Sequence, residues 1–198
     1  MNVSTVLVSA LLSQAGLPPQ LSDFQPASAA VLEAASAIST LPDTTVLSYP
    51  VSGRDRRSIR ASMSEKSPAN AEGEQHDALT FWRYEFGAAP FADGQCRPET
   101  IEVRYTVLVV LPELMTRDQI SVRERAEWDR YFARVVNHES RHRQIAVEGA
   151  DRLREVMRAA PTCEEAQVFA ASEMERIAQT SVEFDAETQH GATDGAVY

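Results

Sequence analysis

Hydrophobic residues in the first half of the chain follow the two-residue period of β-strands. The segment TFWRYEF, residues 80–86, alternates between two faces, and residues 45–51 form an apolar run that leads into a Ser-Gly turn. Residues 100–112 alternate at first and then become continuously apolar, so their second half is expected to be buried on both faces and to end at Pro112. Residues 58–63 are a possible partner strand.

Two long amphipathic patterns in the second half of the chain predict two helices. The first begins after Ser121 and continues to Ala160, and the second begins after Thr162 and continues to Phe184. Ser121 and Thr162 each stand three residues before a glutamate, which is the capping-box pattern. The polar, glycine-bearing residues 184–198 are expected to form a loop. Strands followed by two long helices predict an α+β domain with an antiparallel β-sheet.

The first 44 residues differ in character from the rest of the chain. Residues 1–20 are apolar and uncharged, and Ser13-Gln14-Ala15 resembles a cleavage site, but the basic residues that open a secretory signal are missing. A signal peptide, an apolar N-terminal helix and a misassigned start codon are all compatible with this pattern. Residues 17–44 are rich in Pro, Ala and Ser and are expected to be a spacer with one weak helix, so the predicted domain spans residues 45–198.

Charge and hydrophobicity narrow the classes of partner. The formal net charge of −10 argues against a nucleic-acid surface, which needs clustered positive charge. No apolar run is long enough to span a bilayer. The sequence therefore predicts neither a nucleic-acid partner nor a stable membrane span, and it leaves the oligomeric state open.

One motif on the first predicted helix carries chemistry: His138-Glu139-Ser140-Arg141-His142, an H-E-x-x-H pattern. At about 100° per residue, its two histidines and its glutamate fall on the apolar face of the helix and are expected to point into the protein. Two histidines four residues apart lie one above the other, as two ligands of a tetrahedral zinc ion do. Glu139 is offset to one side and can act as general base in metal-assisted hydrolysis. The alternative is a chance match, with a buried histidine pair satisfied by hydrogen bonds.

The residues alone leave the third zinc ligand open. Glu148 has the spacing of a metzincin ligand, but Ile145 stands where a helix-breaking glycine is needed, so Glu148 is expected to face solvent. Glu173 falls within the apolar stripe of the second helix, as a gluzincin ligand does, although a long side chain at a stripe edge can also reach solvent. His190 follows the second helix and either folds back over the first or is an exposed terminal histidine.

Cys96 and Cys163 are the two cysteines of the chain. They are either two independent buried thiols or a disulfide that ties the sheet region to the start of the second helix. The disulfide is favoured because it agrees with a leader that would direct the chain to an oxidising compartment.

From Val46 onward the chain resembles the bacterial family DUF922 of predicted secreted zinc-dependent proteases. The matching pieces are YPVSG, IRASM, ALTFWRYEF, VLPEL, WDRYFARVVNHESRH and FDAETQHGATDGA, together with both cysteines. The family pairs its H-E-x-x-H helix with a late Asp-x-x-Thr-x-His-Gly segment, which runs from Asp185 to Gly191 here.

This resemblance implies roles for particular residues. His190 would close the zinc site of His138 and His142, with Asp185 beside it as an orienting group or alternative ligand. The tyrosine that usually precedes this aspartate is Phe184 here, so a role for its hydroxyl is not carried over. The resemblance also implies a secreted protein, in agreement with the leader and the disulfide.

These expectations combine into a secreted or periplasmic zinc metallopeptidase acting on a peptide or protein, with Glu139 as general base and later proton donor. An extended substrate would add to the sheet beside residues 100–111. One alternative is a non-catalytic envelope or binding module with a structural zinc, which four protein ligands, including both Glu173 and His190, would favour. The other is a zinc amidase that acts on cell-wall peptides.

Overall fold

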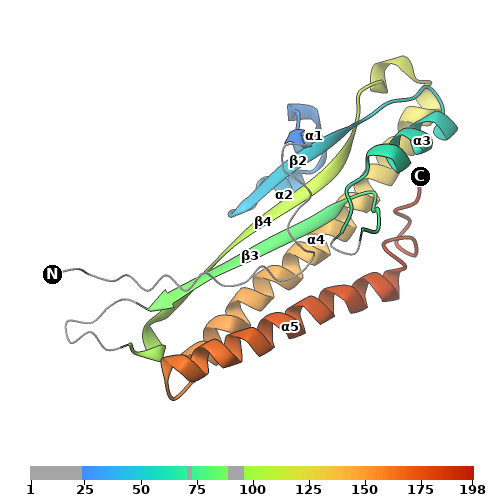
Figure 1. Ribbon diagram of the computed structural model, residues 1–198. Helices are drawn as coiled ribbons and strands as arrows, with labels where there is room; N and C mark the ends of the chain where they lie inside the picture. The colour runs from blue at the N-terminus through green and yellow to red at the C-terminus, as the bar shows by residue number, and fades with distance from the viewer. Residues whose placement is uncertain (1–23, 71–72, 89–95) are drawn as a thin grey trace.

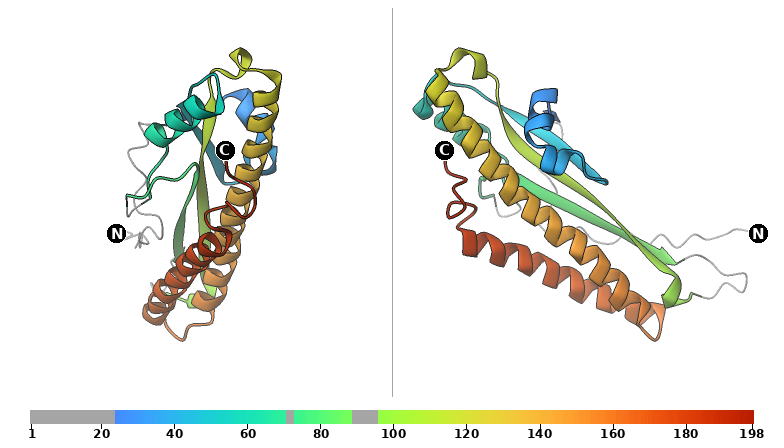
Figure 2. Two further views of the ribbon diagram at one scale, coloured as in Figure 1. Left: turned by 90° about the vertical axis from the view of Figure 1, so that its right-hand side faces the viewer. Right: turned by 180° about the vertical axis from the view of Figure 1, so that it is seen from behind.

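The computed structural model describes residues 24–70, 73–88 and 96–198 (Figure 1). The apolar leader, residues 1–20, for which a signal peptide was one of three interpretations, lies outside the described residues. The described chain is an α+β fold, as predicted, in which a four-stranded sheet is followed by two long helices (Figures 1 and 2).

The sheet is mixed, which corrects the prediction of an antiparallel sheet. Its strands are β1 (Gln25–Pro26), β2 (Thr44–Val51), β3 (Leu79–Ala88) and β4 (Ile101–Leu114), in the order β1-β2-β4-β3. β4 runs parallel to β2 and antiparallel to β3, while β1 runs antiparallel to β2. A parallel pair is possible because the long connection after β2 carries the chain past the position that β4 later fills.

Pro112 does not end β4, as the sequence suggested. The strand continues to Leu114, and Pro112 lies opposite Tyr49 of β2. The pairing of β4 with β3 stops at Val110, so at Pro112 the strand has a neighbour on one side only. A proline is tolerated there because the missing N–H is not needed for a second ladder.

β4 is also not available for an added peptide strand next to the motif helix. Where Thr80 of β3 pairs with Val109, β4 has β2 on its other side. In the first part of β4, Arg154 and Arg158 of the motif helix donate hydrogen bonds to the carbonyl oxygens of two strand residues. The expectation of peptide addition at residues 100–111 is therefore wrong beside the motif, and β3 is the edge strand there.

A short helix, α3 (Arg56–Lys66), replaces the strand expected at residues 58–63. Asp55 caps its N-terminus by accepting a hydrogen bond from a backbone N–H of the first turn. Ile59 and Met63, one turn apart, are its buried residues. Two apolar residues four positions apart fit a helix as well as a strand, so this short pattern was ambiguous.

The two long helices, α4 (Val122–Arg158) and α5 (Cys163–Thr188), form an antiparallel hairpin. α4 packs on β3 and β4, and α5 packs on α4 (Figure 2). The predicted N-cap residues Ser121 and Thr162 both accept a hydrogen bond from the first turn of their helix. α5 continues one turn past Phe184, so the start of the expected C-terminal loop is helical.

The second half of the expected spacer belongs to the fold. It forms the short helices α1 (Ala29–Ala34) and α2 (Ser36–Ser39). Val31, Ala35 and Ile38 of this segment are buried and join the hydrophobic core. Burial of these side chains contributes to stability, which a flexible spacer does not do.

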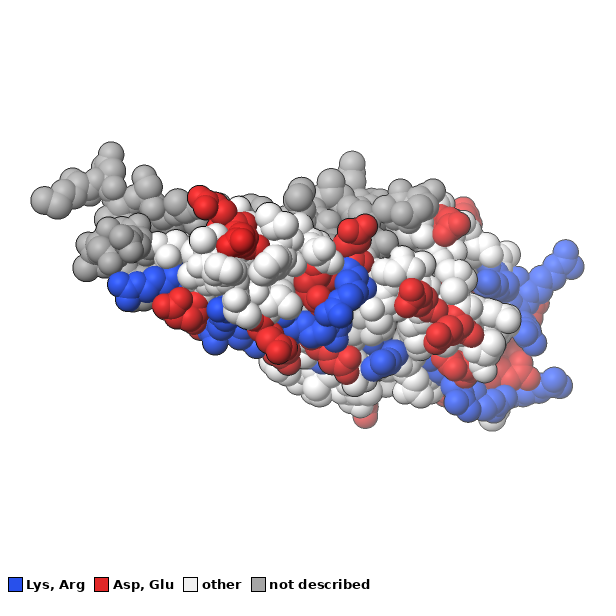
Figure 3. Space-filling model, turned by 90° about the horizontal axis from the view of Figure 1, so that it is seen from below, with Lys and Arg blue, Asp and Glu red and all other residues white. Residues whose placement is uncertain are grey.

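Charged side chains of both signs mix along the face shown in Figure 3. This face does not present the concentrated positive charge that a nucleic-acid backbone attracts. Within the described part of the chain, helices long and apolar enough to cross a membrane are absent.

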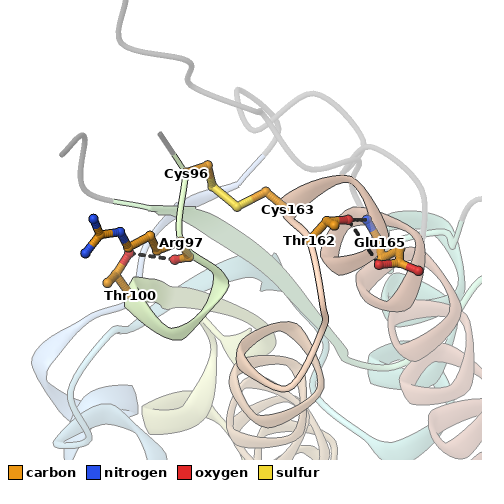
Figure 4. Close-up of a disulfide and its surroundings, with 6 residues drawn as sticks. All are labelled: Cys96, Arg97, Thr100, Thr162, Cys163 and Glu165. Carbon is orange, nitrogen blue, oxygen red and sulfur yellow. Dashed lines mark hydrogen bonds between the residues drawn. A yellow bond between two sulfur atoms is a disulfide. The ribbon is translucent and has the colours of Figure 1, made fainter. Parts of the chain in front are cut away.

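Cys96 and Cys163 form a disulfide (Figure 4), as predicted. Their Cα atoms lie 6.3 Å apart. The bond joins the segment before β4 to the first residue of α5, so it ties one end of the sheet to the helix hairpin.

We expect the double variant Cys96→Ser/Cys163→Ser to unfold more readily than the oxidised protein. The bond spans 67 residues, and constraining a loop of that length in the unfolded chain contributes up to about 4 kcal/mol to the free energy of unfolding. Urea unfolding measures the difference, and the reduced wild type should match the variant. Equal midpoints for the oxidised wild type and the variant would contradict this expectation.

Candidate metal centre

The H-E-x-x-H motif lies in the middle of α4 with its two histidines and its glutamate turned inward, as predicted. His138, Glu139 and His142 expose only 7%, 4% and 6% of their surface. The centroids of the two imidazole rings are 4.8 Å apart. Phe184 of α5 stacks on the ring of His138 and meets that of His142 edge-on. The motif therefore lies at the interface between α4 and α5.

Asp185 of α5 brings a third metal-ligating atom to the two histidines. Its Oδ1 lies 3.1 Å from Nε2 of His138 and 2.9 Å from Nε2 of His142, and the two Nε2 atoms are 3.2 Å apart. Among the described residues, these three side chains make the one group of three or more histidine, cysteine or carboxylate donors close enough to share a metal ion. The candidate metal centre is thus a His–His–Asp cluster.

The spacing of this cluster can accommodate a metal ion. Each Nε2 faces both the other Nε2 and the same carboxylate oxygen, and if both nitrogens carry a proton, two donors face each other. An ion held tetrahedrally at about 2.0–2.1 Å separates its ligand atoms by about 3.3 Å. The observed separations of 2.9–3.2 Å are close to that value. Two imidazole nitrogens and a carboxylate oxygen form a donor set that suits zinc.

The outer nitrogen of His142 is Nδ1, the ring nitrogen that faces away from the cluster. It contacts a residue that the sequence analysis missed. This nitrogen lies 2.8 Å from Oγ of Ser181, which is buried on α5. A proton donated from Nδ1 to this hydroxyl leaves the lone pair of Nε2 free for a metal ion. Ser181 could have been found from its spacing, because it stands four residues before Asp185 and thus on the same face of the helix.

Glu139 points toward the sheet and is held there by β3. Thr80 donates a hydrogen bond of 2.7 Å from Oγ1 to Oε2 of Glu139, and both side chains are buried. The two-residue alternation of β3 includes Thr80, but a pattern within one strand does not reveal a partner on a helix. Thr80 is therefore a second site residue that sequence reasoning missed.

The cluster and Glu139 line a cavity of about 800 Å³. A volume of this order is typical of sites that bind small ligands or peptide side chains, which span about 300–1,000 Å³. All four histidines of the chain line this cavity, although His76 stands before β3 and His190 follows α5. The fold thus gathers the imidazoles of four separate positions around one space.

The structure does not bring His190 into the donor cluster. Its Nδ1 lies 3.9 Å from Oδ1 of Asp185, and its side chain is 57% exposed. Its ring instead packs against His76, with centroids 5.0 Å apart, and burial together with the nearby His190 lowers the pKa of His76. Asp185, which the resemblance placed beside the metal, holds the position of the third donor because it lies in the last turn of α5.

Glu173, the other candidate ligand, serves a different network. It is buried, with ion pairs to Arg152 at 3.0 Å and to Arg176. It stands twelve residues before Asp185, which corresponds to about 18 Å along a helix. The structure therefore separates Glu173 from the cluster, and the two arginines account for its burial.

The groups of the cluster shift one another's pKa values in opposite directions. Burial alone would raise the pKa of Asp185, but hydrogen bonds with His138 and His142 and the charges of both imidazoles hold it well below its usual range. Burial likewise opposes protonation of His138, but its hydrogen bond with Asp185 and the nearby carboxylates, including Glu139 and Asp194, raise its pKa. Without a metal ion, the site therefore favours a protonated His138 beside an ionised Asp185.

We expect His138 to make the metal-free protein lose stability as the pH rises above about 6.5, whereas the lowered pKa of His76 acts in the opposite direction only below that pH. The raised pKa of His138 stabilises the fold fully below about pH 6.5, the ordinary histidine value, and this contribution is lost as the pH passes the raised value. The lowered pKa of Asp185 acts oppositely, and its contribution is lost only in acid. Thermal unfolding in the presence of a chelator measures this profile. A midpoint that rises steadily to pH 8 would contradict it.

A family model described as "Bacterial protein of unknown function (DUF922)" matches residues 46–191. The matched region includes three of the four strands, both long helices and all three members of the donor cluster. No curated protein and no solved structure matches the chain.

Proposed function

The chain belongs to the DUF922 family of bacterial proteins of unknown function, and we propose that it is a zinc-dependent hydrolase that cleaves peptide bonds. The observation that carries the proposal is the buried triangle of His138, His142 and Asp185 beside Glu139, in one cavity. Three protein donors and a neighbouring carboxylate are the combination that catalytic zinc sites use, since they leave one coordination position for the reaction.

His138 and His142 would hold the ion through Nε2, and Asp185 would hold it through Oδ1. When bound there, zinc supplies Lewis acidity that polarises a carbonyl group and makes water a better nucleophile. With Nδ1 of His142 donating to Oγ of Ser181, His142 takes the tautomer whose Nε2 can bind the ion. The negative charge of Asp185 offsets part of the charge of the cation.

Glu139 is the proposed general base and later the proton donor. Its carboxylate accepts a proton from the attacking water as the new C–O bond forms, and it returns that proton to the nitrogen as the C–N bond breaks. Thr80 fixes one oxygen of the carboxylate during both transfers. Burial of Glu139 keeps bulk water from competing for the same proton.

The edge of β3 is the proposed docking place for the peptide backbone. The cavity is lined by residues 77–80 and by Trp82, so it follows the start of this strand. β3 is an outer strand of the sheet, and an extended peptide can pair with the free side of such a strand. This position brings a peptide past Thr80, the residue that holds Glu139.

The alternative with a structural zinc receives less support. A structural site is closed by four protein ligands, and it would gain strongly if Glu173 and His190 both joined the two motif histidines. Glu173 is engaged by two arginines and His190 is exposed. The cluster also borders an open cavity, which a closed structural site does not need.

We further propose that the protein acts in a secreted or periplasmic setting. The Cys96–Cys163 disulfide supports this, because such bonds form and persist in oxidising compartments.

Metal removal tests the proposed function. We expect about one zinc ion per chain, because the cluster offers a single set of donors. Treatment with 1,10-phenanthroline should abolish hydrolysis of a peptide library while the far-UV circular dichroism is retained, and added zinc should restore activity. Hydrolysis that survives complete metal removal would contradict the proposal. Unfolding on chelation, without any hydrolysis by the zinc-loaded protein, would favour the structural alternative.

A further inference from the structure

The two motif histidines differ in how their outer nitrogens are held. Nδ1 of His142 has the hydroxyl of Ser181 as a partner. Nδ1 of His138 is buried and has no hydrogen-bond partner among the described residues. A histidine that binds a metal through Nε2 carries its proton on Nδ1, and metal-ligating histidines almost always donate this proton to a carboxylate, carbonyl or water. The site therefore lacks one partner.

Asp194 is the carboxylate nearest to supplying it. Its Oδ2 lies 3.7 Å from Nδ1 of His138, and its side chain is 46% exposed. For a hydrogen bond of ordinary length, the distance between Oδ2 and Nδ1 must shorten by less than about 1 Å. A half-exposed side chain is free to make this movement. Asp194 comes from the segment after α5 and faces Nδ1 of His138, whereas Asp185 faces Nε2.

A compact series of turns carries Asp194 to this position. Gln189, His190 and Gly191 follow α5 with φ angles of 50°, 53° and 82°, so three successive residues are left-handed. The backbone N–H of Gly191 donates to Oγ1 of Thr188, and that of Asp194 donates to the carbonyl of Gly191. These bonds bend the chain directly after the helix, and the residues that follow lie along α4, where Tyr198 packs against Trp128 and Tyr131.

Gly191 shows how closely this segment packs on the metal centre. A Cβ atom at this position would lie 3.2 Å from both Cγ and Nδ1 of His138 and 3.0 Å from Cβ of Ala196. Such contacts are tighter than side chains normally make, and the φ of 82° is itself unfavourable for a residue with a side chain. The glycine therefore lets the segment lie against the ring of His138, on the side of its outer nitrogen.

We propose that Asp194 is a positioning residue of the metal centre, which accepts a hydrogen bond from Nδ1 of His138 and so keeps Nε2 turned toward the ion. The inference rests on the proposed metal site. It gives the two histidines unlike supports, a neutral hydroxyl from Ser181 for His142 and a carboxylate for His138. It also gives the residues after α5 a role in metal binding that does not require His190 to be a ligand.

The test is the zinc affinity of Asp194 variants, measured by competition with a chromophoric chelator. We expect Asp194→Ala to weaken zinc binding about 10–100-fold, which is the usual effect of removing such a supporting group. Asp194→Glu should give an intermediate affinity, because it restores a carboxylate on a longer side chain. Glu187→Gln is the matched control, since it removes one negative charge from an exposed position on the last turn of α5 and should leave the affinity unchanged.

Two further readouts separate positioning from a general structural role. Nitrogen-15 NMR of the zinc-loaded protein should show a protonated Nδ1 on His138, with a proton shift that changes in Asp194→Ala. The unfolding temperature of the metal-free variant should stay close to that of the wild type. Zinc affinity of Asp194→Ala within twofold of wild type would overturn the inference, as would a wild type that binds no zinc. Zinc binding without hydrolysis by the wild type would overturn only the proposed function.

Discussion

Replacing Glu139 by glutamine is expected to lower kcat/KM for peptide hydrolysis by about 10²–10⁴-fold, the range that a general acid–base group contributes. Glutamine has nearly the same shape, and its amide oxygen can still accept the hydrogen bond from Thr80. It cannot accept a proton from water at neutral pH. The substitution therefore removes proton transfer and leaves the surrounding packing in place.

Zinc content separates this effect from damage to the metal centre. Glu139 is outside the donor cluster, so the variant should bind zinc within about twofold of the wild type, well short of the 10–100-fold loss that follows removal of a supporting group. Glu148→Gln on the same helix is the matched control, because Glu148 bonds to Gln144 on the outer side of α4 and should keep full activity. Full activity in Glu139→Gln would remove this glutamate from the mechanism.

The helical half of the protein could be predicted from the sequence because its signals are local. The apolar stripe of α4 runs through the motif, so inward-facing positions for His138, Glu139 and His142 followed from the 3.6-residue period alone. The N-caps Ser121 and Thr162 lie next to the helices they cap, and both were correct. Patterns of this kind depend on residues that are near in sequence, so they can be recognised without knowledge of the tertiary structure.

The arrangement of the sheet could not be predicted in the same way. Alternation along β3 and β4 gives each strand two faces, but it does not say which strand lies beside which. The parallel pairing of β2 with β4 depends on where the connection containing α3 crosses, which is a property of the whole chain. Pro112 was expected to end a strand because the absence of a second neighbour at that position is not visible in the sequence.

The site shows the same division between local and distant information. The motif on α4 was found from its spacing. Its partners lie on other elements, Thr80 on β3 and both Ser181 and Asp185 on α5. The end of α5 was placed four residues too early, and this put Asp185 in a loop. A single extra helical turn places a residue that was expected in a loop on the same face of α5 as Ser181.

Replacement of Asp185, the proposed third zinc ligand, is expected to have the largest effect on metal binding. Asp185→Asn should weaken zinc binding by more than the 10–100-fold that a supporting residue costs, because an amide oxygen carries no charge and is a poorer zinc ligand. His190→Ala should change the affinity much less, since its Nδ1 lies outside the donor triangle and its side chain is largely in solvent. Competition with a chelator of known affinity measures both variants.

Glu173→Gln serves as the control for a buried acidic residue on the same helix, and it should leave zinc affinity unchanged because its partners are Arg152 and Arg176. The opposite ranking, with a far larger loss in His190→Ala than in Asp185→Asn, would mean that the residues after α5 close onto the ion and that His190 is the third ligand. The ranking thus distinguishes a centre completed by the last turn of α5 from one completed by the chain beyond it. Asp185 and His190 border the same cavity as Glu139, so Glu139 keeps its position in both arrangements. The two arrangements differ in charge, because an aspartate ligand is negative and a histidine ligand is neutral.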